Sequence, residues 1–282
     1  MKKICNFSKH PYCIDLYLDE VETFVTYSFT NTRKCNNRSS YEPNHRKMRS
    51  SILYDADSRL ILKFGVEADK ERHRSQDNKN IFYVDNVFMH LDSVYSRSKQ
   101  KKYKNDIHDL MIQEGVVLFL KQLHEGFSLG RLTTHITDLD YHFAITIPTH
   151  WNETIREVHL RELFIKAGLV SKEDHSDRLL IFTRLESRFR YLQSLKHESS
   201  QMSSKIRYGR LYTMYAIKVI DSKIIVALDL FSAQYPSVPA FDDYYLAKSI
   251  KSIYFTIPVY PKRSFSKHTI VNASYRLLSN TF

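Results

Sequence analysis

Glycine is scarce in this chain. Only six glycines occur in 282 residues, although average usage would give roughly twenty. Loops that wrap a phosphate in backbone N–H groups need glycine, because a side chain blocks the close approach and the positive φ angles. Neither G-x-G-x-x-G nor G-x-x-x-x-G-K-[ST] occurs in the sequence. Rossmann and Walker-type nucleotide sites are therefore excluded.

Cysteine and long apolar runs are scarce as well. The three cysteines, Cys5, Cys13 and Cys35, are too few for a disulfide framework or a four-cysteine zinc site, so we expect structural thiols. The longest apolar runs, 116–120 and 224–228, are far shorter than the roughly 20 residues of a membrane span. Polar residues at 6–10 interrupt any signal peptide. We expect a cytoplasmic protein that does not enter the membrane.

The charge that is present is mostly positive. The chain has 42 Lys and Arg against 31 Asp and Glu, a net charge of +11, and 43% hydrophobic residues, enough for a packed core. Basic residues cluster at 33–49 and 99–104, with Tyr41, Tyr95 and Tyr103 nearby. Such clusters could follow a nucleic-acid backbone, or they could be solvated loop charges. Thirteen histidines include no H-E-x-x-H pair, so we expect no metal site built on histidine.

The apolar patterns predict strands and helices in a recognisable order. An N-terminal pair of strands is followed by an exposed basic loop, two further strands, a long helix, a strand–helix–strand–helix unit and three more strands. The predicted ranges are 12–18 and 22–29 for the first strands, 31–50 for the loop, 51–54 and 60–64, 105–124 for the helix, 141–147, 152–168, 178–182, 185–192, and finally 212–220, 223–230 and 253–260. Meander strands followed by alternating strands and helices indicate an α/β fold with a mixed sheet.

The central stretch resembles a known family. Residues 143–153 read F-A-I-T-I-P-T-H-W-N-E, similar to the V-P-A-x-[FW]-[ND]-[DE] strand end of the heat-shock-70 branch of the actin-like ATPase superfamily. The agreement continues through Ala167-Gly168-Leu169 to 178–180, and 64–68 resembles a G-x-x-A segment of divergent members. The resemblance covers residues 12–235.

The resemblance implies an α/β fold of the actin-like, ribonuclease-H-like type, with a mixed sheet and helices. Residues 1–235 would form the first lobe, with an inserted helical region near 81–130. Residues 236–282 would begin a second lobe that is truncated, or the chain would be a fragment of a longer product. The implied cofactor is ATP or ADP with Mg²⁺, and a protein partner would be expected.

The resemblance also places the site residues. The family's first phosphate loop, I-D-[LF]-G-T-T, matches residues 14–19, where Asp15 is retained and the glycine is Tyr17. The second loop, D-L-G-G-G-T, matches residues 229–234, where Asp229 is retained and every glycine is replaced. Asp15 and Asp229 are the candidate nucleotide and Mg²⁺ residues, and they should converge on one cleft. Both could equally be strand-end residues that bond local backbone groups.

In this alignment, the position of the family's water-orienting glutamate corresponds to Arg184. Shifting the alignment by two residues would place Glu186 at that position. Arg184 and Arg188 could bind an anion at a helix start or lie on a solvated face. Trp151 should be a core residue. A two-metal nuclease would need more carboxylates than Asp15 and Asp229.

From the resemblance and the changed phosphate-loop positions, we expect a degenerate, heat-shock-70-like ATPase that binds nucleotide weakly and hydrolyses it negligibly. The alternative is a non-catalytic scaffold or nucleic-acid-binding module that acts through the basic loops.

Overall fold

The computed structural model describes residues 12–19, 22–29, 46–99, 106–129, 141–194, 206–220, 223–234 and 246–258. Cys5, Cys35 and all of the basic residues in 33–45 and 100–105 lie outside these ranges. The chain divides into two compact units, Met1–Ser187 and Arg188–Phe282. This division falls earlier than the lobe boundary expected at 235, and the assignment of 236–282 to a second lobe stays a prediction.

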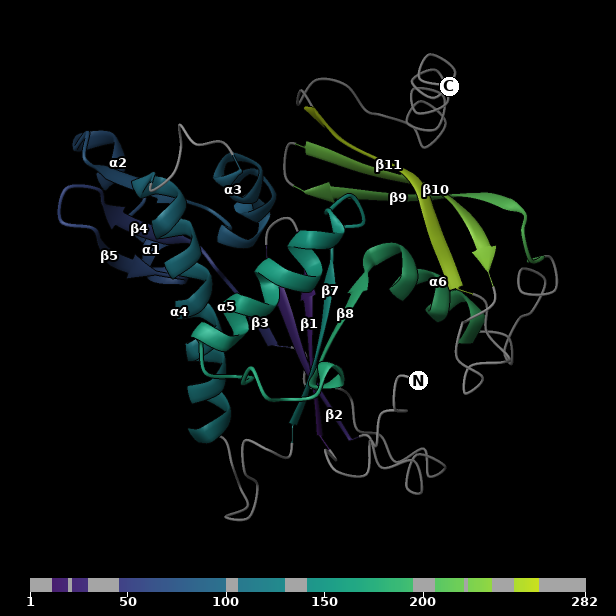
Figure 1. Ribbon diagram of the computed structural model, residues 1–282. Helices are drawn as coiled ribbons and strands as arrows, with labels where there is room; N and C mark the ends of the chain where they lie inside the picture. Colours follow the sequence, from purple (N-terminus) through teal and green to yellow (C-terminus); the bar gives the residue numbers. More distant parts are fainter. Residues whose placement is uncertain are drawn as a thin grey trace. The chain divides into compact units, whose positions relative to one another are not determined.

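A five-stranded mixed sheet organises the first unit. Its strands are β1 (Tyr12–Leu18), β2 (Thr23–Phe29), β3 (Arg46–Met48), β7 (Tyr141–Ile147) and β8 (Leu179–Thr183), in the order β3-β2-β1-β7-β8 (Figure 1). The first three strands are antiparallel, whereas β7 and β8 run parallel to β1. A three-strand meander extended by two parallel strands next to its first strand is the actin-like, ribonuclease-H-like sheet predicted from the sequence.

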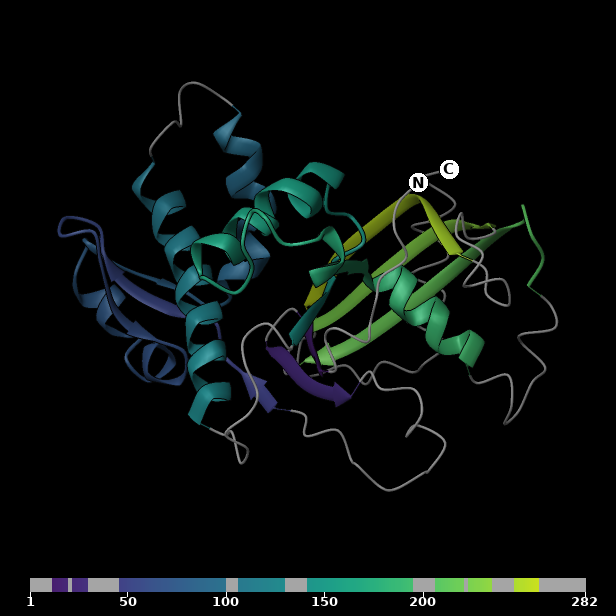
Figure 2. The same cartoon turned by 60° about the horizontal axis from the view of Figure 1, so that its bottom comes forward.

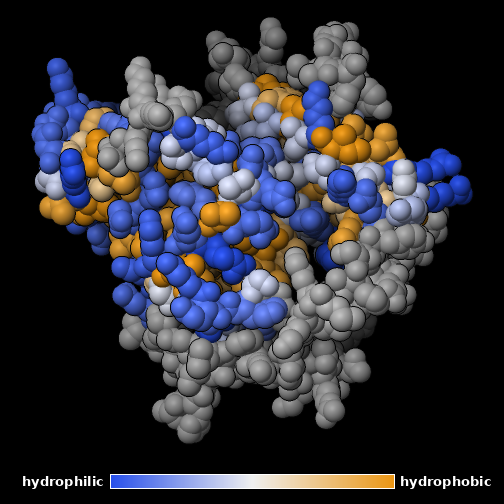
Figure 3. Space-filling view, viewed as in Figure 1, coloured by the Kyte–Doolittle hydropathy of each residue, from blue (hydrophilic) through white to orange (hydrophobic). Residues whose placement is uncertain are grey.

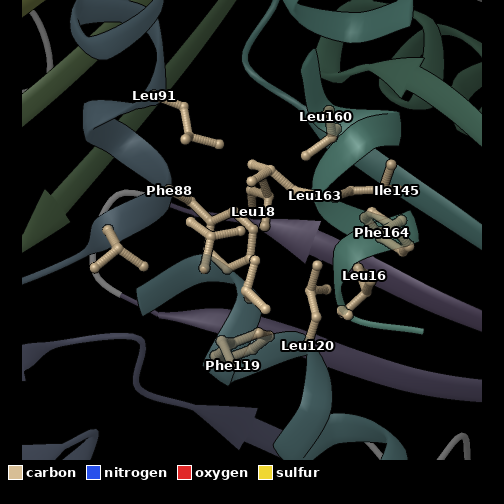
Figure 4. Packing of buried hydrophobic residues seen from close by; sticks show 14 of the residues in the cluster. Leu16, Leu18, Phe88, Leu91, Phe119, Leu120, Ile145, Leu160, Leu163 and Phe164 are labelled. Atoms are coloured by element: carbon tan, nitrogen blue, oxygen red, sulfur yellow. The ribbon is translucent and has the colours of Figure 1, made fainter. Parts of the chain in front are cut away.

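One face of this sheet carries the main core. Ile14, Leu16 and Leu18 alternate along β1 with Cys13, Asp15 and Tyr17, so the apolar and polar residues lie on opposite faces. The apolar face is covered by α4 (Ile107–Leu129) and α5 (Arg161–Lys166). Figure 4 shows Phe119 and Leu120 of α4, and Leu163 and Phe164 of α5, around Leu16 and Leu18. The packing leaves the polar face of β1 for other interactions.

The strand–helix unit at the centre is confirmed. Strand β7 is an interior strand, and all of its residues except Thr146 are buried. A π-helical segment, η5 (Ile155–Leu160), leads into α5, and Gly168 follows with φ +78°, a left-handed conformation that ends the helix. Trp151 is buried at the start of this segment, as predicted.

A second, antiparallel sheet completes the first unit. It contains β4 (Ile52–Asp55), β5 (Leu60–Phe64) and β6 (Ile81–Val84) in the order β5-β4-β6. Figures 1 and 2 both show α4 between this sheet and the five-stranded one. Gly115 of α4 permits this contact, because a Cβ there would lie 2.9 Å from Val87 and 3.0 Å from Ile52. The remaining short elements are α1 (Val66–Lys70), α2 (Arg74–Asp77), η2 (Val87–His90), α3 (Leu91–Ser98) and η6 (Ser176–Arg178).

The prediction of one exposed loop over 31–50 is wrong at its end. Arg46–Met48 form β3, which pairs with Thr23–Val25 of β2. Arg46 and Lys47 are nevertheless exposed, because β3 is an edge strand of three residues. The strand was not predicted because two of its three residues are basic and exposed; Met48 is its one apolar residue packed against the core.

The second unit contains a three-stranded antiparallel sheet. Its strands are β9 (Leu211–Ile220), β10 (Lys223–Gln234) and β11 (Leu246–Pro258), in the order β11-β10-β9. The preceding helix, α6 (Arg184–Ser194), spans the division between the units. Strand β11 begins seven residues before the predicted strand at 253–260. Its pairing with β10 crosses residue 235, so β10 and β11 belong to one sheet.

Candidate functional site

The strand ends of the five-stranded sheet are the natural place for a ligand. The parallel strands β1, β7 and β8 all end at the same edge, and ligands of α/β sheets bind outside the carboxyl ends of such strands. Here that edge is formed by Leu18 and Asp19 after β1, Thr149 after β7, and Thr183 and Arg184 at the junction of β8 and α6. The family's first phosphate loop would occupy the turn after β1.

The side chain of Arg184, the first residue of α6, contacts the end of β1. Its Nε donates to the Leu18 carbonyl oxygen at 3.0 Å, and its Nη2 donates to the same oxygen at 2.5 Å. The side chain is 4% exposed, so the prediction that it lies on a solvated face is wrong. A guanidinium has no acceptor and does not lose its proton in proteins. Arg184 therefore cannot replace the family's glutamate as a group that orients or deprotonates water.

An aromatic side chain fills the position of the phosphate-loop glycine. The ring of Tyr17 lies edge-on to Phe24, its partner on β2, with centroids 6.3 Å apart. The Arg184 guanidinium carbon lies 5.8 Å from the Tyr17 ring centroid, within cation–π range. Phe24, Tyr17 and Arg184 thus form a cluster of side chains at the position that the resemblance assigns to the glycine of the first phosphate loop.

The turn after β1 is also held from the side of the second sheet. Asn86 donates from Nδ2 to the Asp19 carbonyl oxygen at 3.0 Å, and Ser50 donates from Oγ to Asn86 Oδ1 at 2.9 Å. The Asp19 N–H donates to the carbonyl of Glu22 at 3.1 Å. Asn86 and Ser50 are buried. Backbone groups that could contact an anion or a cation are therefore bonded within the chain.

The N-terminus of α6 is capped by its own side chains. Thr183 Oγ1 accepts from the Glu186 N–H at 3.1 Å, and Glu186 Oε2 accepts from the Thr183 N–H at 2.7 Å, which is a capping box. The next N–H, that of Leu185, donates to Thr149 Oγ1 at 3.1 Å. These N–H groups would otherwise be available to an anion. The Glu186 carboxylate therefore has a structural role, since it accepts a hydrogen bond from the Thr183 N–H at the start of α6.

Asp15 lies on the polar face of β1 and is half-buried. Its neighbours in the sheet are Thr26 of β2 and Ala144 of β7, and the Cys13 thiol donates to its Oδ1 at 3.6 Å. A hard cation held by protein groups needs several oxygen ligands. The adjacent strands place no second carboxylate directly opposite Asp15.

Asp229 lies in the second unit, in the middle of β10. It is 2% exposed, and Ser252 donates from Oγ to its Oδ1 at 2.5 Å. The residues that match the second phosphate loop, 229–234, do not form a loop. They continue β10 and pair with β11 from Ser252 to Leu246. Phe231 packs edge-on against Phe189, with centroids 5.2 Å apart.

The two candidate aspartates therefore lie within strands rather than at strand ends, and they belong to different units. Their convergence on one cleft stays a prediction. Among the described residues, no group of three or more His, Cys, Asp or Glu side chains is arranged to hold a metal ion.

Sequence reasoning missed most of the contacts at this edge. The capping box could have been read from T-x-x-E at 183–186, directly before a helical pattern. Asn86 and Ser50 carry no such signal, because Asn86 is 67 residues from Asp19 in the sequence.

The described part of the basic clusters bonds within the first unit. Lys47 lies 3.4 Å from Glu22, and Arg49 Nε donates to Asp69 at 2.7 Å. Lys99 lies 4.5 Å from the Tyr95 ring centroid. The use of these basic segments as a nucleic-acid surface stays a prediction. In the part of the chain that the structure covers, no helix is long and apolar enough to cross a bilayer.

Two solved structures are similar to this chain at low identity. MreB 5 of Spiroplasma citri, bound to AMPPNP, aligns with 88% of this chain and 52% of its own, at 12% identity and a TM-score of 0.42. The type II variant of the Aquifex aeolicus Ppx/GppA phosphatase aligns with 95% of this chain and 62% of its own, at 9% identity and a TM-score of 0.29. This chain thus spans about half the length of the MreB chain. No family model and no curated protein sequence matches it.

Proposed function

We propose that this chain is a degenerate, heat-shock-70-like nucleotide-binding domain that does not hydrolyse ATP. The observation that supports this proposal most directly is the bond from Arg184 to the Leu18 carbonyl. The resemblance assigns Arg184 to the position of the family's water-orienting glutamate, and the bond occupies the Leu18 carbonyl at the turn that would form the first phosphate loop.

The proposed loss of hydrolysis follows from how phosphoryl transfer is catalysed. Enzymes accelerate it by positioning and by gathering the developing charge with Mg²⁺, backbone N–H groups and cationic side chains. Here the Leu185 and Glu186 N–H groups bond to threonine hydroxyls, and residues 229–234 bond along β10 and β11. Losing one preorganised contact typically lowers turnover by about a hundredfold or more.

Weak nucleotide binding is the remaining part of the proposal. The resemblance assigns Asp15 and Asp229 to the aspartates of the family's two phosphate loops, and a carboxylate can hold hydrated Mg²⁺ through its waters. The cofactor would then be Mg-ADP or Mg-ATP, held mainly through the metal.

Calorimetric titration with Mg-ADP and Mg-ATP, together with a single-turnover assay, tests both parts. We expect weak binding that Asp15→Ala and Asp229→Ala each reduce, and turnover indistinguishable from buffer. Glu186→Ala, which removes half of the capping box, should leave turnover unchanged and lower only the stability.

Turnover at an ordinary chaperone rate that either aspartate variant abolishes would overturn the proposed loss of hydrolysis. The absence of any heat of binding would overturn the nucleotide-binding part.

A further inference from the structure

The sheet of the second unit has two edges of different chemical character. Strand β11 forms one edge, and it carries the exposed residues Lys248 and Lys251. Strand β9 forms the other edge among the described strands. Its only charged residue is Lys218, which lies on the face of the strand opposite to the exposed residues.

Strand β9 alternates strictly between exposed and half-buried residues. The outward residues include four large apolar side chains with exposed fractions between 42% and 66%: Leu211, Tyr215, Ile217 and Val219. Thr213 is the fifth residue of this row. Figure 3 shows hydrophobic surface over this sheet. We refer to the row of odd-numbered residues 211–219 as the β9 stripe.

An edge strand of ten residues with an uncharged, apolar row is unusual in a protein that stays monomeric. Edges are commonly protected by lysine, proline, a bulge or a very short strand. Strand β11 has two of these protections, the lysines and a register shift at Leu230 and Phe231 of its partner β10. Strand β9 pairs with β10 without a register shift and contains no proline.

We propose that the outer edge of β9 is an interface between two copies of this chain. Two β9 strands related by a two-fold axis would pair antiparallel and extend the sheet across both copies. With Tyr215 opposite Tyr215 of the second copy, Thr213 lies opposite Ile217, and Leu211 lies opposite Val219. Every residue of the β9 stripe then meets another residue of the stripe.

The absence of charge in the β9 stripe permits pairing with a second copy of a basic chain. Like charges directly opposite one another destabilise a strand pair, and the register above sets each residue of the stripe opposite another residue of the same stripe. The β9 stripe satisfies this condition because it has no charge. With a net charge of +11 per copy, most other pairings of the surface would be repulsive.

The length of β9 limits the strength of the dimer. Ten residues extend about 33 Å, and a single strand pair covers less than the roughly 800 Å² per partner of a standard interface. We therefore expect a reversible dimer with a Kd of about 1–100 μM.

Sedimentation velocity of the full chain over a micromolar to submillimolar series tests the proposal. The mass should rise from 33.4 kDa toward twice that value. Ile217→Lys should weaken the dimer at least tenfold, because it places a lysine opposite Thr213 of the second copy, inside the apolar row, and a lysine on an edge strand opposes strand pairing. Ile250→Lys is the matched control, since Ile250 is an exposed isoleucine at the β11 edge, 55% exposed against 43% for Ile217.

A wild-type chain that stays at 33.4 kDa across the series would overturn the proposal, and so would equal weakening by the two lysine variants. Thermal melts check that both variants fold. If Ile217→Lys does not fold, Val219→Lys, at a more exposed position, takes its place in the same comparison.

Discussion

The strand ends of the five-stranded sheet and the edge of β9 differ in how their exposed groups find partners. At the strand ends, Leu18, Asp19 and the first turn of α6 are bonded by Arg184, Asn86, Thr183 and Thr149, all from the first unit. At β9, a row of apolar side chains faces water. The chain's own groups bond to a place where α/β folds usually bind a ligand, whereas the outer strand of the second unit's sheet, among the described strands, carries exposed apolar side chains where lysine or proline is more usual.

This difference indicates which of the two regions is the better candidate for binding a ligand or a partner. Internal bonds at the strand ends must be broken before a ligand can use the same groups, and each costs free energy when it is left unmade. Apolar side chains in water gain free energy when any suitable surface covers them. The fold alone would predict a binding site at the strand ends of the five-stranded sheet. The packing instead indicates one at the edge of β9.

The largest effect should come from removing Arg184. Arg184→Ala deletes two hydrogen bonds to the Leu18 carbonyl and the contact with Tyr17, and leaves a buried acceptor without them. We expect a loss of about 2–4 kcal/mol in the free energy of unfolding, measured by urea denaturation. Arg74→Ala is the control, because its exposed pair with Glu71 should contribute at most about 1 kcal/mol. Equal losses would show that the strand end is not closed by Arg184.

A smaller, pH-dependent effect should come from Asp69, which joins α1 to β4 and β6. Burial alone would raise the pKa of Asp69, but hydrogen bonds from Ser51, Tyr83 and Arg49, with the charge of Arg49, lower that pKa overall. Tyr83 stays a donor, since burial and Asp69 raise the pKa of its hydroxyl to about 12. The folded state therefore favours ionised Asp69. Its contribution is fully present above the unfolded pKa of about 4 and is lost as pH falls through the lower folded value.

Urea denaturation between neutral pH and pH 3 measures this dependence. Asp69→Asn should cost about 1–3 kcal/mol at neutral pH and should flatten the fall in stability below about pH 4. Asp77→Asn, on the exposed helix α2, should reproduce the wild-type curve. A curve for Asp69→Asn that runs parallel to the wild type down to pH 3 would contradict the assigned hydrogen bonds.

The smallest effect should come from the β9 stripe. Val219→Thr keeps the β-branched shape and is 66% exposed, so the unfolding free energy of the monomer should change by less than about 0.5 kcal/mol. The measurement is a thermal melt at a concentration below the proposed dimer Kd. A loss well above this value would mean that Val219 is covered within its own chain, and the contrast between the two regions would disappear.

Hydrophobic pattern alone predicted most of the elements. The alternation along 12–18, the apolar run 141–147 and the helical spacing before Gly168 each gave the observed strand or helix, because burial of one face is a local property of the sequence. The fold class came from the order of these elements together with the motif at 143–153. Strand β3 was missed because it has three residues, of which Arg46 and Lys47 are basic and exposed and only Met48 packs against the core.

The candidate site depended more on tertiary structure. The sequence by itself determined that residues 14–19 and 229–234 contain an aspartate but no glycine, and that T-x-x-E at 183–186 can cap a helix, since each is a matter of residue type at a given spacing. Only tertiary structure decided that Arg184 reaches a carbonyl 166 residues away, that Asn86 holds Asp19, and that one edge of the second sheet is apolar. Contacts between distant segments depend on how strands are ordered and how helices pack, and local composition does not encode either of them.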